Sequence, residues 1–283
     1  MKFKFLFIVV LTAFSSVKMT SQIDVDKTLG ALQNGVVSFT FSNDDAAALS
    51  KEAVRKMDSM NVVAGPKDGY TLRLNRVFRK HANENGLTLN YKVYISKEVN
   101  AFATADGSIR VFSGLMDIMD DNQLLAVIGH EIGHVVNQDS KDAIKTAYRK
   151  AALMGAVSST STKVANVTEG QIGQIASALV DSKYSRKQES EADTFSYDFM
   201  KRNGYDVNAV ESAFAILAKL SGNAEANFFT KMMSSHPDPN NRAETAKNKA
   251  IADGLYKAYV QKAINNKATT TPVKKTTTKK KKK

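Results

Sequence analysis

Residues 120–139 read DDNQLLAVIGHEIGHVVNQD, and the pattern H-E-x-x-H lies inside this stretch. His130 and His134 are four residues apart, so on an α-helix their side chains leave the same face and can bind one metal ion. Glu131 lies about 100° around the helix from His130, within reach of a water beside that metal. A ligand pair for a Lewis acid, next to a carboxylate that accepts a proton, predicts a hydrolytic zinc site.

The same stretch is predicted to form one buried helix. Apolar residues occupy most of its sides, namely Leu124, Leu125, Val127, Ile128, Ile132, Val135 and Val136. Asp120 can cap the N-terminus of this helix, with Gln123 at the third position in a variant of the capping box. The alternative is a chance match on a core helix. The chain has only 4 histidines, so this pattern is rarely expected by chance.

A third protein ligand is needed, because two histidines alone hold zinc poorly. The class of sites with a further histidine six residues after His134 is excluded, since Ser140 occupies that position. The chain contains no cysteine, so the missing ligand must be a histidine or a carboxylate.

The best candidates lie on a predicted helix, Ser185–Asn203. Glu189 and Asp193 share one face of it, beside an apolar stripe, whereas Glu191 points away. We therefore predict Glu189 as the third metal ligand. Asp193, one turn further on, is predicted to accept the free N–H of a ligand histidine. The alternative is a solvated acidic face paired with neighbouring basic residues.

A second histidine-containing segment reads Ser235-His236-Pro237-Asp238-Pro239, with Arg242 shortly after it. Near a metal, an imidazole or guanidinium can stabilise the oxyanion of a tetrahedral intermediate. In a proline-rich loop, His236 can equally be a surface residue. The residues alone do not decide between these two interpretations.

The two ends of the chain differ in character from its middle. Residues 1–21 have early lysines and an apolar run from Phe5 to Phe14, which predicts an export signal rather than a membrane anchor. Residues 266–283 are rich in lysine and threonine and are predicted to be disordered; the alternative is a weak tether to anionic surfaces. The net charge of +12 comes almost entirely from these two segments, so the basic character does not predict a nucleic-acid partner.

The predicted fold is α+β and mostly helical, with one domain over residues 22–265. Residues 22–69 are expected to form a helical extension packed on it. Strands are predicted only at Leu87–Ser96, Asn100–Thr104 and Ile109–Phe112, as a small antiparallel sheet beside the H-E-x-x-H helix. Residues 140–184 are expected to be irregular apart from a helix at 169–180, and a final helix should run from Pro239 to about Asn265.

Four blocks, in this order, resemble the HtpX and CAAX prenyl endopeptidase superfamily of gluzincin metallopeptidases, in particular its soluble periplasmic group typified by BepA and LoiP. The blocks are Asn100-Ala101-Phe102-Ala103 through Gly114-Leu115, His130-Glu131-Ile132-Gly133-His134, Ser185-Arg186-x-x-Glu189-x-x-x-Asp193, and Ser235-His236-Pro237 with Arg242. The resemblance covers roughly residues 70–250. Unlike the membrane members, the chain is expected to have no transmembrane helices, and unlike BepA it is expected to carry no helical-repeat domain.

The resemblance implies one Zn²⁺ per chain, bound by His130, His134 and Glu189, with Glu131 as general base. It also implies that His236 lies near the metal as a transition-state stabiliser or a gating ligand, supported by Arg242. The segment containing Asn100, Ala101 and Phe102 is similar to the family's edge strand, which pairs with an extended substrate. These features together predict an exported, periplasmic or secreted zinc endopeptidase that cleaves unfolded polypeptides. The alternatives are a zinc-binding chaperone with little proteolysis and an inactive binding module.

Overall fold

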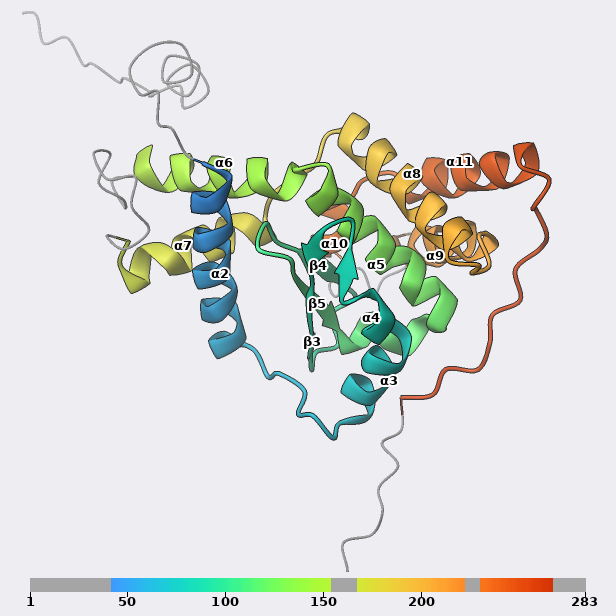
Figure 1. The fold of residues 1–283 in the computed structure, drawn as a ribbon, viewed down its shortest axis with the longest axis horizontal. Helices are drawn as coiled ribbons and strands as arrows, with labels where there is room; N and C mark the ends of the chain where they lie inside the picture. The colour runs from blue at the N-terminus through green and yellow to red at the C-terminus, as the bar shows by residue number, and fades with distance from the viewer. Residues whose placement is uncertain (1–41, 154–166, 222–229, 267–283) are drawn as a thin grey trace, which may run out of the picture. The chain divides into compact units, whose positions relative to one another are not determined.

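The structure, a computed structural model, describes residues 42–153, 167–221 and 230–266. The predicted export signal at 1–21, and the predicted tail apart from its first residue, lie outside these ranges. The described helices and strands, labelled in Figure 1, are α2 (Asn43–Met60), α3 (Gly69–Phe78), η1 (Arg79–His81), β1 (Asn83–Glu84), β2 (Leu87–Thr88), β3 (Asn90–Tyr94), β4 (Ala101–Ala103), β5 (Ser108–Phe112), α4 (Ser113–Ile118), α5 (Asp121–Val136), α6 (Asp139–Leu153), α7 (Glu169–Val180), α8 (Arg186–Arg202), α9 (Asn208–Ser221), α10 (Thr230–Ser235) and α11 (Pro239–Ala252).

Helix α5 carries the H-E-x-x-H motif through the middle of the main core. The predicted capping box is present: Asp120 accepts hydrogen bonds from the backbone of Asn122 and Gln123, and the Gln123 side chain accepts one from the Asp120 N–H. All residues from Gln123 to Val135 are buried, as expected for a helix that is apolar on most sides. Helices α8 and α9, strand β4 and helix α6 pack around it.

The main sheet has the order β3-β5-β4 and lies between α2 and α5 (Figure 1). The predicted class is confirmed: a mostly helical α+β fold with a small sheet beside α5. One detail differs, because β3 pairs with β5 in parallel and only β4 is antiparallel to β5. The chain reverses direction between β3 and β4 and again between β4 and β5, so the first and last strands run the same way. Strand β4 is left at the edge of the sheet.

Helix α6 contradicts the prediction of an irregular segment after Ser140. Three of its residues, Ile144, Ala147 and Tyr148, recur at helical spacing and are buried. They form a satellite core with residues of α2 and α7. The segment is mostly polar, so its composition does not indicate a buried face. The residues that bury this face lie more than 20 residues away in sequence, in α2 and α7.

The final helix ends earlier than predicted, at Ala252, although Asp238 and Pro239 begin it as predicted. Gly254 follows with a left-handed φ of 66°, the conformation that commonly terminates helices. The chain then continues as an irregular strap to Asn266. Within this strap the Tyr259 hydroxyl donates to both carboxylate oxygens of Asp120, the cap of α5, at 2.9 and 2.7 Å. These contacts anchor the strap to the start of the H-E-x-x-H helix.

None of the helices in the part of the chain that the structure describes is both long and apolar enough to cross a bilayer.

Candidate metal centre

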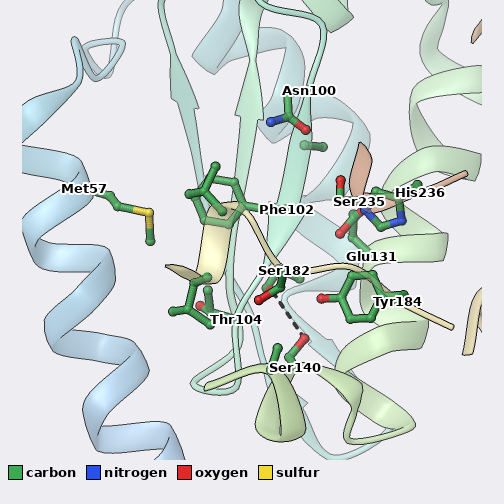
Figure 2. Close-up of a pocket in the computed structure, with 15 residues that line it drawn as sticks. Met57, Asn100, Phe102, Thr104, Glu131, Ser140, Ser182, Tyr184, Ser235 and His236 are labelled. Carbon is green, nitrogen blue, oxygen red and sulfur yellow. Dashed lines mark hydrogen bonds and ion pairs between the residues drawn. The ribbon is translucent and has the colours of Figure 1, made fainter. Parts of the chain in front are cut away.

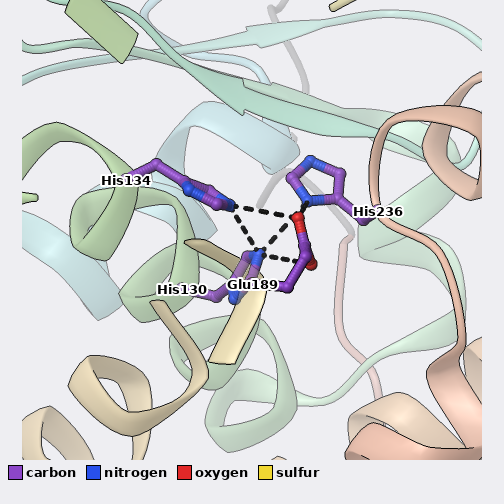
Figure 3. A group of neighbouring side chains, drawn as sticks. All are labelled: His130, His134, Glu189 and His236. Carbon is purple, nitrogen blue, oxygen red and sulfur yellow. Dashed lines mark hydrogen bonds and ion pairs between the residues drawn. The ribbon is translucent and has the colours of Figure 1, made fainter. Parts of the chain in front are cut away.

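Four buried side chains converge at one point beside α5: His130, His134, Glu189 and His236 (Figure 3). One potential ligand atom from each lies within 4.8 Å of all the others. The Nε2 atoms of His130 and His134 are 3.0 Å apart, as expected for two histidines one turn apart on a helix. The structure thus brings together the three predicted ligands and places His236, from the α10–α11 connection, beside them, where the family resemblance implied it.

Close approach of α5 and α8 brings Glu189 to the two motif histidines. Gly133, inside the motif, faces Ala192 of α8, and a Cβ added to Gly133 would lie 2.9 Å from the Ala192 Cα. A larger residue at Gly133 would therefore push the two helices apart. Ser196 fixes the same contact, because its hydroxyl donates to the Ala126 carbonyl at 2.6 Å. Glu191, in contrast, is exposed and lies 3.7 Å from Lys187.

Glu131 points into the pocket next to the four-residue cluster and is only 1% exposed. Its Oε1 has no hydrogen-bond partner and lies 3.7 Å from the His236 Nε2. Burial raises the pKa of this carboxyl. A buried acceptor without a partner is costly unless a water or ligand satisfies it. The position therefore suits a carboxylate that binds and deprotonates a water.

The electrostatics of the cluster favour a bound cation. Burial opposes charge on Glu189, yet the surrounding imidazoles hold the pKa of this carboxyl well below its usual range. Burial alone lowers the pKa of His134, but its hydrogen bonds with Asp139 and Glu189 outweigh burial and raise it to about 9. A metal ion and a proton would compete for this nitrogen. Imidazole nitrogens around a carboxylate oxygen are the ligand chemistry that zinc prefers.

Asp193 and Arg242 form a buried network behind His130. The Asp193 Oδ1 lies 2.8 Å from the His130 Nδ1, as predicted for an acceptor of the free ring N–H. Burial, together with the charge of Arg242, lowers the pKa of His130 to about 3. The Arg242 guanidinium donates to Asp193 at 2.7 Å and lies 2.8 Å from Glu189 Oε2. Arg242 therefore holds two carboxylates in place.

Two residues of the site escaped the sequence analysis. Asp139, at the start of α6, lies 2.9 Å from the His134 Nδ1 and also accepts a hydrogen bond from Gln188 at 3.0 Å. Tyr184 stacks on His134 with a centroid distance of 3.8 Å and an interplanar angle of 12°. Asp139 could have been predicted as a partner of His134, because it is an acidic residue that follows the motif helix directly. Tyr184 carried no such signal, because its contact depends on tertiary structure.

A pocket beside Glu131 runs along the edge strand β4 (Figure 2). Of the residues predicted to bind substrate, Asn100, Ala101 and Phe102 all line it, together with His236. The Phe102 ring packs against Tyr94 and Phe112. Asn100 is buried, and its side chain donates to Glu98 at 3.1 Å. The predicted strand thus lines the pocket together with Glu131 and His236, and His236 also belongs to the four-residue cluster.

Comparison with known proteins identifies related sequences. The profile described as Peptidase family M48 matches residues 70–250. The chain is 38% identical over 236 residues to Metalloprotease YcaL of Escherichia coli K12, which covers 83% of this chain and 91% of YcaL. It is 37% identical over 230 residues to Metalloprotease LoiP of the same organism, covering 80% and 90% of the two chains. The Beta-barrel assembly-enhancing protease of E. coli K12 is 27% identical over 179 residues, 60% of this chain and 36% of that protein.

Proposed function

Because the chain belongs to peptidase family M48 and is a metalloprotease, we propose that it is a zinc-dependent endopeptidase acting on unfolded or misfolded polypeptides in the cell envelope. The observation that carries this proposal is the buried cluster of potential ligands beside Glu131, whose Oε1 faces the same pocket without a partner. We assign His130, His134 and Glu189 as the zinc ligands.

Each residue of the centre has a proposed role in peptide hydrolysis. Zn²⁺, when bound, polarises the scissile carbonyl and lowers the pKa of the attacking water. Glu131 accepts the proton of that water and later delivers it to the leaving amine. Asp193 fixes the His130 imidazole in one tautomer, and Arg242 keeps Asp193 and Glu189 ionised and oriented.

Strand β4 is the proposed binding surface for substrate. It is an edge strand that lines the pocket next to Glu131, so an extended peptide can add to it as a further strand. Main-chain pairing makes recognition depend mainly on the substrate's being unfolded. We propose Asn100, Ala101 and Phe102 as the contact residues on this strand.

Export to the envelope is part of the proposal and rests on residues 1–21. We propose that residues 22–265 form one domain, whose N-terminal extension, residues 22–69, includes α2. No nucleic-acid partner is proposed. The lysine-rich tail is proposed to make at most weak contacts with anionic surfaces.

Zinc removal is expected to abolish the activity of the full-length protein. Purified protein should contain one zinc per chain by atomic spectroscopy and should cleave unfolded casein. Chelation should stop cleavage, and added Zn²⁺ should restore it, because the bound metal is the Lewis acid and the described residues contain no second group of potential ligands. Stoichiometric zinc without cleavage of any unfolded substrate would instead favour the alternative, a zinc-binding chaperone or assembly factor.

His236 is proposed to stabilise the oxyanion that forms when water attacks the scissile carbonyl. Its Nε2 lies 3.7 Å from Glu131, and its Nδ1 lies 2.9 Å from Glu189. Replacement by alanine is expected to lower kcat/KM about 100-fold while zinc content stays unchanged, as for removal of one oxyanion donor. An increase in kcat/KM would show that His236 is a gating ligand instead, and an unchanged value would remove it from the mechanism.

A further inference from the structure

The edge of β4 presents a fixed set of main-chain groups to the pocket. The Phe112 N–H donates to the Asn100 carbonyl, and the Thr104 N–H donates to the Ser108 carbonyl, both at 3.0 Å. In an antiparallel pair, hydrogen-bonded residues alternate with residues whose main-chain groups face the other way. Asn100 and Thr104 therefore bond towards β5, while Ala101 and Ala103 face the free edge of the sheet. An added peptide strand has to pair with these two alanines.

One of these outward groups is already occupied. Ser140, at the start of α6, is buried, and its hydroxyl donates to the Ala103 carbonyl at 3.2 Å. The Ala103 carbonyl, the last outward-facing acceptor of β4, is thus already hydrogen-bonded to Ser140. The edge available to a substrate ends there. A peptide lying along β4 needs a different hydrogen-bonding partner at this point.

The Tyr184 hydroxyl stands at this end of the edge. Figure 2 shows it pointing towards β4, beside Ser140 and below Glu131. The ring is held in place by stacking on His134, and the Tyr184 N–H donates to the Ser235 carbonyl at 3.3 Å. A phenol can both donate and accept a hydrogen bond. This hydroxyl is therefore a rigidly placed polar group at the position where the ladder stops.

We propose that Tyr184 is a substrate-binding residue whose hydroxyl hydrogen-bonds a main-chain peptide group of the extended substrate, next to the end of β4. The proposal rests on the proposed endopeptidase function and specifies how its substrate is held. The ring and the hydroxyl have separate roles: the ring supports the ligand His134 through stacking, and the hydroxyl contacts the peptide. A main-chain contact is independent of substrate sequence, which agrees with an unfolded-polypeptide substrate.

The test uses the full-length, zinc-loaded protein in an inactive Glu131→Gln background, so that binding is measured without cleavage. Fluorescently labelled casein is titrated, and its anisotropy gives Kd. Tyr184→Phe keeps the ring and removes only the hydroxyl, so Kd is expected to rise about tenfold, the value of one hydrogen bond, with zinc content unchanged. In active protein that retains Glu131, Tyr184→Phe should raise KM by a similar factor and leave kcat nearly constant.

Two further variants separate this contact from a purely structural role. Tyr70→Phe removes a hydroxyl that bonds Asp117 on α4, outside the pocket, and should leave Kd and KM unchanged. Tyr184→Ala should in addition lower zinc affinity, because the stack on His134 is lost. The proposal would be overturned if Tyr184→Phe left Kd unchanged in the Glu131→Gln background and left KM unchanged in protein that retains Glu131. Failure of the endopeptidase function itself would appear separately, as absence of cleavage by the unsubstituted protein.

Discussion

Glu131→Gln is expected to lower kcat/KM for unfolded casein about 1000-fold while zinc content remains one per chain. The amide has the size and shape of the carboxylate, so the buried position can accommodate it without repacking. It cannot accept a proton from the attacking water, and general-base catalysis contributes about 100- to 10,000-fold. The loss should therefore appear in kcat, with KM and metal content little changed.

The control for this variant is Glu211→Gln, which makes the same chemical change on α9 outside the pocket and should leave kinetics unchanged. Zinc is measured on the same samples as activity. Equal turnover by Glu131→Gln and the unsubstituted protein would refute the assignment of Glu131 as base. Loss of zinc in Glu131→Gln would make the carboxylate a structural partner of the centre.

The local part of the site was predictable from sequence because it depends on one helix. The spacing of His130 and His134 fixes their shared face, and the capping box at Asp120 fixes where that helix begins. Glu189 could be chosen over Glu191 for the same reason, since helical periodicity alone separates their faces. In each case the deciding contact lies within a single turn or two of chain.

The remaining features depend on contacts that no local pattern encodes. The predicted final helix was too long because Lys262 and Tyr259 bond to Asp120 across the fold, which holds the strap in an irregular path. The parallel pairing of β3 and β5 follows from the path of the chain around β4, which alternation of apolar residues does not report. The stacking of Tyr184 on His134 likewise depends on tertiary structure, because the two residues are far apart in sequence.

Glu189→Ala is expected to lower zinc affinity by more than about 100-fold and to abolish casein cleavage. Loss of a residue that only hydrogen-bonds a metal ligand lowers metal affinity by about 10- to 100-fold, so loss of a ligand itself should exceed that range. The substitution removes the proposed oxygen ligand and also leaves the Arg242 Nη1 without its carboxylate at 2.8 Å. With only Asp193 left to offset its charge, the guanidinium beside His130 repels a divalent cation more strongly. Both effects weaken the centre in the same direction.

The measurement must be an affinity, obtained by competition with a chromophoric chelator, rather than zinc content after purification. His236 Nδ1 lies 3.2 Å from the His130 Nε2, so three imidazoles could retain some zinc after Glu189 is lost. Glu191→Ala is the matched control, because this exposed carboxylate is on the same helix but faces Lys187. Lower affinity in Glu191→Ala with no change in Glu189→Ala would reverse the ligand assignment. Combining Glu189→Ala with His236→Ala should abolish the residual binding if the third imidazole is its source.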